Sequence, residues 1–315
     1  MTLRDRPAFR RAQLCTLLAT AIGLLLSALP ITASATHQMV MSNGAPIHWK
    51  SNSSSTALRS INVFDNLTSS AAGQHWRSFL SGDRANWDNA MYLTLTGAGA
   101  LSSDEYNCPI STKGVVVCNW NDYNGLGNGG NLYAGLAEFV VYYSTGHVSS
   151  VRVRLDDEHS GMNYSGQTCV ETGNVAGPCQ VAAHSAQCQE LGHAWGLDHI
   201  AGDTCMGAGY FASSAFQVAP NAHDYDRIRA THAHIDGGAT AASLSATGVR
   251  AAQAHDHGQD RAVIDPPPPG DCRRKKVKEN LFVERVCGPE AKGSADLIRI
   301  IDALPPKTPV PASGP

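Results

Sequence analysis

The alternation of apolar and polar residues predicts a set of short β-strands. Residues 60–64, Ser-Ile-Asn-Val-Phe, begin with polar and apolar side chains in turn, as a half-buried strand does. Later runs rich in β-branched and other apolar residues predict strands at 91–95, 115–117, 138–143 and 148–155. Because helical patterns occur between and after these runs, we expect an α+β fold.

Three segments carry patterns that favour helices. Residues 71–90 have large apolar side chains at roughly helical spacing, and Gly82 interrupts them, so this segment predicts one helix or two short ones. These apolar side chains are Trp76, Phe79, Leu80 and Trp87. Residues 179–195 predict another helix, and 221–234 predict a third with a weaker apolar stripe.

Composition divides the rest of the chain into loops and boundaries. Residues 124–131 contain four glycines and predict a loop, as do residues 166–178. Residues 237–270 are rich in Ala, Gly, Ser and His and end in a run of prolines, which is typical of a linker or a disordered segment. We therefore expect one domain at 46–236, this linker, and a short disulfide-containing tail at 271–315.

The first 36 residues have the pattern of a secretory signal peptide. Four arginines precede an apolar run from Leu14 to Leu29, and Ala33-Ser34-Ala35 offers a cleavage site. The alternative is an uncleaved membrane anchor, although the run is short for a span. The chain is therefore expected outside the cytoplasm, either secreted or periplasmic, with no stable membrane insertion after cleavage. A net charge of −3 gives no field that would recruit nucleic acid.

Nine cysteines agree with export. Cys15 lies in the signal peptide, and an even count of eight remains, which predicts four disulfides in a secreted chain. Connectivity cannot be deduced from the sequence. Nearest-neighbour pairing would give Cys108–Cys118, Cys169–Cys179, Cys188–Cys205 and Cys272–Cys287. A zinc cluster of cysteines is the rival interpretation, but the chain has no C-x-x-C.

Residues 189–199, Gln-Glu-Leu-Gly-His-Ala-Trp-Gly-Leu-Asp-His, carry the clearest chemistry. They follow the zinc-protease pattern H-E-x-x-H-x-x-G-x-x-H, except that Gln189 takes the place of the first histidine. Helical residues four apart share a face, so Gln189 and His193 can point at one ion with Glu190 beside it. Gly196 allows the helix to stop, and the chain can then return His199 as a third ligand.

This ligand set predicts Zn²⁺ as the cofactor. Three protein ligands, Gln189, His193 and His199, leave the fourth zinc position for water. Zinc lowers the pKa of that water towards ~7, and Glu190 is the predicted general base that takes its proton. The Gln189 amide oxygen is a neutral and weaker ligand than imidazole. Two other histidines are candidates to replace the missing ligand, but His184 should face the opposite side of the helix, and a structural role is expected for His223.

The motif resembles that of the metzincin zinc endopeptidases, most closely a bacterial matrixin-like branch with Gln in place of the first ligand histidine. The resemblance covers roughly residues 46–236. Residues 76–87 resemble the family's first helix, 130–139 the segment leading into the strand that borders the cleft, Thr204-Cys205-Met206 the methionine turn, and 221–225 the start of the C-terminal helix.

The resemblance implies a fold and an activity. The fold would be a metzincin-like catalytic domain, with a twisted mixed sheet, an active-site helix and a C-terminal helix. Gly196 would serve structurally at the site, and Met206 would pack beneath the ligand histidines. Metzincins are often latent, sometimes through a pro-segment cysteine on the zinc. Here about twenty residues separate the signal peptide from the first predicted strand and none is cysteine, so latency by that route is not expected.

The predicted function is that of a monomeric, exported zinc endopeptidase acting on proteins or peptides. The alternative is a weak or inactive pseudo-protease that binds peptides without cutting them. A third hypothesis places the function in the tail, whose basic run Arg273-Arg274-Lys275-Lys276-Val277-Lys278 would bind an anionic surface. A solvated charge run is the simpler interpretation of that segment.

Overall fold

The computed structural model describes residues 37–50, 59–88, 93–102, 108–110, 114–120, 135–157, 178–200, 202–207, 217–232, 262–278, 281–288 and 296–303. The chain divides into Met1–Ser34 and Ala35–Pro315, and all described residues belong to the second unit. The expected signal peptide, the loop 124–131 and most of the loop 166–178 and of the linker lie outside them. Within the described part, no helix is long and apolar enough to cross a bilayer.

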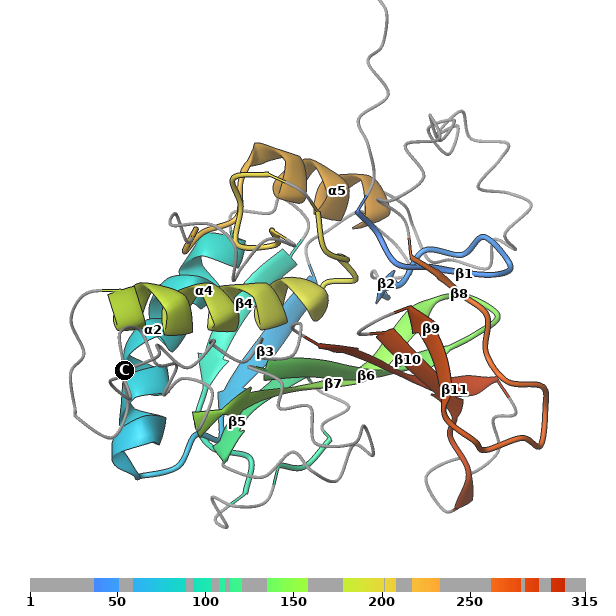
Figure 1. Ribbon diagram of the computed structural model, residues 1–315, viewed down its shortest axis with the longest axis horizontal. Helices are drawn as coiled ribbons and strands as arrows, with labels where there is room; N and C mark the ends of the chain where they lie inside the picture. The colour runs from blue at the N-terminus through green and yellow to red at the C-terminus, as the bar shows by residue number, and fades with distance from the viewer. Residues whose placement is uncertain are drawn as a thin grey trace, which may run out of the picture. The chain divides into compact units, whose positions relative to one another are not determined.

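The described strands form a mixed sheet with α-helices, which confirms the α+β class (Figure 1). The order along the sheet is β4-β3-β5-β7-β6-β11-β10-β9, and β2 also pairs with β7. Strands β3, β4, β5 and β7 run parallel, whereas β6 runs antiparallel to both of its neighbours. The bounds are β2 His48–Trp49, β3 Arg59–Asp65, β4 Leu93–Ala98, β5 Gly114–Trp120, β6 Gly135–Tyr142, β7 His147–Asp156, β9 Lys275–Lys278, β10 Leu281–Arg285 and β11 Leu297–Ala303.

Three helices accompany the sheet: α2 (Ala71–Asp88), α4 (Pro178–His193) and α5 (Ala222–His232). The Ser70 hydroxyl caps the start of α2 by accepting the Gly73 N–H at 3.1 Å. Helix α2 runs unbroken through Gly82, since one exposed glycine costs only about 1 kcal/mol. Burial of the predicted apolar stripe, Trp76, Phe79, Leu80 and Trp87, outweighs that cost.

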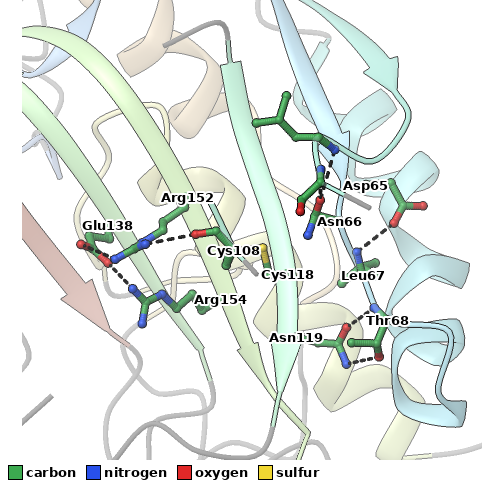
Figure 2. The surroundings of a disulfide bond; sticks show 12 residues. Asp65, Asn66, Leu67, Thr68, Cys108, Cys118, Asn119, Glu138, Arg152 and Arg154 are labelled. Carbon is green, nitrogen blue, oxygen red and sulfur yellow. Dashed lines mark hydrogen bonds and ion pairs between the residues drawn. A yellow bond between two sulfur atoms is a disulfide. The ribbon is translucent and has the colours of Figure 1, made fainter. Parts of the chain in front are cut away.

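The two faces of the sheet differ in character. On the face covered by α2 and α4, alternate residues of the strands join the main apolar core, as Val115 and Val117 of β5 do. Residues between them point to the other face, where Cys118 is bonded to Cys108 (Figure 2). Strands β5 and β6 are therefore buried on both faces and are nearly continuous apolar runs, whereas β7 carries half-buried arginines on its second face.

A buried carboxylate on that second face joins three strands. Glu138 of β6 pairs with Arg152 and Arg154 of β7 at 2.8 and 2.9 Å, as Figure 2 shows, and with Arg299 of β11 at 3.0 Å. Burial alone would raise the pKa of Glu138. The hydrogen bond and charge of Arg152, with the charges of Arg154 and Arg299, outweigh burial and hold the pKa below its ordinary value.

We expect Glu138→Gln to destabilise the protein by about 3 kcal/mol at neutral pH, because three arginines lose their buried partner. A carboxyl with a depressed pKa stabilises the fold above the ordinary pKa of glutamate, and this contribution is lost as the pH falls below about 4. Urea unfolding at pH 7 and in acid checks both points. The difference in stability between wild type and variant should shrink in acid; an equal difference at both pH values would contradict the role given to Glu138.

The C-terminal segment differs from the expected separate tail, because β9, β10 and β11 continue the main sheet beyond β6. The expected linker also contains structure near its end: β8 (Val263–Ile264) pairs in parallel with β1 (Val40–Met41). The apolar run of β11 is buried in the same core as the central strands. Strand β11 pairs with β6 and β8 pairs with β1, in each case more than a hundred residues away along the chain, and local patterns do not reveal such pairing.

Three of the four nearest-neighbour disulfides are present: Cys108–Cys118, Cys188–Cys205 and Cys272–Cys287. The expected Cys169–Cys179 pair includes a cysteine outside the described residues. Most of the cations in the basic run of the tail have acidic partners in the protein. Arg273 pairs with Asp271, Arg274 with Glu284, Lys275 with Asp265 and Lys278 with Asp198. This run therefore resembles a paired charged face more than a docking surface.

Candidate metal centre

Helix α4 ends at the motif because Gly196 turns the chain. Its φ of +88° lies in the left-handed region, and a β-carbon there would stand 2.2 Å from the Ile47 carbonyl oxygen, so only glycine fits. The N-terminal segment then fixes the turn: Met39 N–H donates to the Gly196 carbonyl at 3.0 Å, and Asp198 N–H donates to the His37 carbonyl. This arrangement leads the chain to His199.

The two motif histidines converge. The Nε2 atoms of His193 and His199 lie 3.0 Å apart. His193 Nδ1 faces the Leu197 carbonyl at 2.9 Å, and because a carbonyl can only accept, Nδ1 carries the proton and Nε2 presents its lone pair. Burial lowers the pKa of His193 to about 4 and the pKa of His199 well below its ordinary value. Both rings are therefore neutral at pH 7, the form that binds metals.

Gln189 and Glu190 are fully buried one turn before His193. Neither polar atom of the Gln189 side chain has a hydrogen-bond partner among the described residues. A buried amide in that state costs free energy unless a ligand satisfies it. The Glu190 side chain packs beneath the first residue of β6: a β-carbon on Gly135 would lie 2.7 Å from Glu190 Cγ. The Glu190 side chain therefore lies between α4 and the start of β6.

Met206 and a disulfide support the motif helix from the other side. Met206 is fully buried, and a β-carbon on Gly192 would stand 2.1 Å from its sulfur, so the glycine before His193 makes room for it. The Cys188–Cys205 disulfide ties α4 to the turn that carries Met206. Trp87 of α2 donates its indole N–H to the Cys188 carbonyl at 3.0 Å. These contacts restrain the helix that carries three of the predicted site residues.

The other candidate histidines lie elsewhere. His184 Nε2 contacts Asp83 of α2 at 2.6 Å, on the side of α4 away from His193, as its position in the sequence predicts. His223 stacks on His37, whose Nε2 pairs with Asp224 at 3.1 Å, and these three could hold an ion of their own. The Asp224 carboxylate already accepts the Asn221 N–H at the start of α5. A structural role for His37, His223 and Asp224 therefore accounts for their contacts.

One acidic residue at the site was missed in the sequence. A carboxylate oxygen of Asp302 on β11 and a ring nitrogen of each of His193 and His199 lie within 4.8 Å of one another. Asp302 is fully buried, and its nearest approach to His193 is 3.5 Å, to Nδ1. The only local signal is an acid within the apolar run Leu-Ile-Arg-Ile-Ile-Asp-Ala. Because Asp302 lies far from the motif along the chain, no local pattern connects it with the two histidines.

The donor set fits a zinc ion. Two nitrogens bound to one tetrahedral zinc at about 2.05 Å lie about 3.3 Å apart, close to the 3.0 Å between the Nε2 atoms of His193 and His199. The buried, unpaired amide of Gln189 supplies a third donor one helical turn away. Neutral imidazole and amide oxygen are both ligands that zinc accepts.

A comparison with protein-family models and with curated proteins finds no match to this chain.

Proposed function

We propose that this protein is an exported zinc endopeptidase that hydrolyses peptide bonds in proteins or peptides. The observation that carries the proposal is the convergence of the His193 and His199 Nε2 atoms, 3.0 Å apart, with the carboxylate of Glu190 buried about one turn before His193 in the same helix. Such a convergence of two neutral imidazoles is unfavourable without a proton or a cation between their lone pairs. Zinc is the cation that best suits this donor set.

Each residue has a separate task. His193, His199 and Gln189 would hold the metal, and the Leu197 carbonyl fixes the tautomer of His193 through its Nδ1 proton. When bound, zinc supplies Lewis acidity that acidifies water and polarises a substrate carbonyl. Glu190 accepts the proton of the attacking water and passes it to the departing amine. Its burial beneath Gly135 keeps bulk water from that carboxylate.

The resemblance to metzincins agrees with several features of the structure. The sheet is mixed, and β6 runs antiparallel beside the parallel strands β4, β3, β5 and β7. Strand β6 (Gly135–Tyr142) begins within residues 130–139, the segment that resembles the one leading into the strand that borders the cleft. Met206 lies under the motif helix at Gly192, where a methionine turn is expected. Disulfides fit an extracellular or periplasmic protein. Membership of this family is part of the proposal.

A peptide-binding protein without catalysis is the second candidate. The observation that favours it is Gln189, since an amide oxygen holds zinc more weakly than the imidazole that the motif usually supplies. A protein that lost its metal could keep the same fold and still bind a peptide. Metal content and hydrolysis separate the two candidates.

The test is reversible removal of the metal from the purified full chain. We expect about one zinc per chain by elemental analysis, and slow hydrolysis of a mixed peptide substrate by the zinc-loaded protein. A chelator should abolish hydrolysis, and added zinc should restore it. Hydrolysis that persists in the metal-free protein would exclude the proposed mechanism. Stoichiometric zinc without any hydrolysis would favour the binding protein instead.

A further inference from the structure

Three residues outside the motif come together at the start of α5. His37 of the N-terminal segment, His223 and Asp224 each offer a ligand atom, and these atoms all lie within 4.8 Å of one another. His37 and Asp224 are fully buried, whereas His223 is half-buried. Two histidines and one carboxylate form a donor set that binds divalent transition metals. The cluster contains none of the predicted site residues of the motif.

One nitrogen of His37 already has its partner. Its Nδ1 lies 2.8 Å from the Asp198 carbonyl oxygen, and because a carbonyl can only accept, Nδ1 carries the proton. In the neutral ring, Nε2 then presents a lone pair, and it lies 3.1 Å from Oδ1 of Asp224. Neither of these two atoms has a hydrogen-bond partner among the described residues. Two buried electron-rich atoms therefore face each other, and a cation between them would relieve their repulsion.

The other oxygen of Asp224 is held in place. Oδ2 accepts the Asn221 N–H at 2.8 Å and the Thr204 hydroxyl. The Asn221 side chain accepts the N–H groups of His223 and Asp224 at 2.9 and 3.2 Å, which caps the start of α5. Oδ1 is therefore the oxygen left to bind an ion. Outer hydrogen bonds that orient a ligand carboxylate and a ligand histidine are typical of metal sites.

The spacing of the three side chains fits one tetrahedral ion. A nitrogen and an oxygen bound to zinc at about 2.0 to 2.1 Å lie about 3.3 Å apart, close to the 3.1 Å between His37 Nε2 and Asp224 Oδ1. The centres of two imidazole rings bound to one such ion lie about 5 Å apart. The ring centres of His37 and His223 lie 5.0 Å apart. Three protein ligands leave the fourth position for water.

We propose that His37, His223 and Asp224 form a second metal site, which holds a zinc ion and fastens the N-terminal segment to the start of α5. This site is separate from the motif and does not depend on the proposed function. The ion would also hold the turn after Gly196, because His37 makes two hydrogen bonds with Asp198, through its Nδ1 proton and through its carbonyl. Such an ion has a structural role, as these residues do.

The second site should bind zinc more weakly than the motif. It lies at the N-terminus of α5, where the helix dipole disfavours a cation, whereas His193 ends α4, where the dipole favours one. In the metal-free protein a proton on His37 Nε2 can take the place of the ion and pair with Asp224, and zinc must displace that proton. We therefore expect dialysed protein to keep about one zinc per chain, at the motif, and to take up a second only when free zinc is supplied.

The first test counts zinc by equilibrium dialysis of the full chain against micromolar free zinc. We expect about two zinc ions per chain in the wild type and about one in His223→Ala and in Asp224→Asn. Asparagine keeps an oxygen for the two hydrogen bonds that Oδ2 accepts, and alanine replaces a half-buried ring, so both variants should fold. Asp226→Asn is the matched control, since Asp226 is an exposed aspartate of the same helix that pairs with Arg229. It should bind as many ions as the wild type.

The counts separate this site from the motif. A second zinc that persists in both His223→Ala and Asp224→Asn would mean that it binds elsewhere in the chain, and the proposed site would be overturned. A wild type that takes up only the ion lost in His193→Ala would also overturn it, and would leave the proposed function in place. If instead His193→Ala changes nothing and Asp224→Asn removes the bound ion, the second site stands and the proposed function fails.

The second test asks whether the ion fastens the N-terminal segment. Met39, two residues after His37, donates its N–H to the Gly196 carbonyl at 3.0 Å. If this bond opens only when the ion leaves, zinc at about a hundred times its dissociation constant should slow exchange of the Met39 amide about 100-fold, relative to dialysed protein. The slowing should disappear in Asp224→Asn and remain in Asp226→Asn. Unchanged exchange in the wild type with the second ion bound would overturn the fastening.

Discussion

Replacing His193 with alanine is expected to remove zinc from the protein. Its Nε2 faces the Nε2 of His199 at 3.0 Å, and its Nδ1 proton is held by the Leu197 carbonyl, so this ring is the most firmly oriented donor of the site. Removing even an orienting partner of a ligand costs 10- to 100-fold in metal affinity. Removing the ligand itself should weaken zinc binding by about 100-fold or more, measured by competition with a chelator.

His184→Ala is the matched control for this prediction. His184 lies on the same helix, nine residues earlier, but its Nε2 contacts Asp83 of α2. The control variant should lose some stability and keep its zinc. Equal zinc affinity in the His193 and His184 variants would mean that the metal, if bound, sits elsewhere in the protein.

Replacing Glu190 with glutamine is expected to abolish hydrolysis and leave the metal in place. Glutamine keeps the size of the side chain packed under Gly135, but it cannot accept a proton from water. Loss of a general base costs about 10²- to 10⁴-fold in rate. The rate of peptide hydrolysis by the zinc-loaded variant should fall by this factor, because no other group is expected to take the proton.

Two further measurements on the Glu190→Gln protein test whether the loss of hydrolysis comes from the missing base and not from loss of zinc or of stability. Zinc content should stay near one per chain, and the temperature of unfolding should not fall, since a buried carboxylate is replaced by a neutral group. A variant that keeps its zinc and still hydrolyses peptides at the wild-type rate would show that another group is the base. A variant that loses its zinc would show that Glu190 holds the metal.

Local patterns in the sequence predicted the elements that carry the motif. The i, i+4 relation of Gln189 and His193 depends only on helix geometry, and the apolar run of β5 is a strand buried on both faces. Gly196 predicted the end of the helix because few other residues adopt its backbone angle. Each of these predictions needed only residues close together in the chain.

The sequence could not predict contacts between segments that are far apart along the chain. Nothing in residues 297–303 tells which sheet edge accepts them, and their register on β6 decides that Asp302 lies beside His193. The N-terminal segment gave no periodicity, yet His37 and Met39 hold the turn after Gly196 through backbone hydrogen bonds. Backbone hydrogen bonds form between N–H and C=O groups that every residue except proline carries, so a sequence pattern cannot reveal which segments pair.

Gln189 decides how the site should be understood. Its amide is buried without a hydrogen-bond partner among the described residues, on the helical face shared with His193. As a zinc ligand it would satisfy that amide, and the Cys188–Cys205 disulfide next to it would keep a weak ligand in position. If Gln189 did not bind zinc, its buried amide would destabilise the fold, and no hydrogen bond among the described residues would offset that cost.

The central claim is that one zinc ion lies between His193 and His199. A crystal of the zinc-loaded full chain, measured at the zinc absorption edge, locates that ion directly. The account predicts one anomalous peak about 2.1 Å from the Nε2 atoms of both histidines, with the Gln189 amide oxygen turned towards it. A zinc-loaded crystal with no peak between these two rings would contradict it.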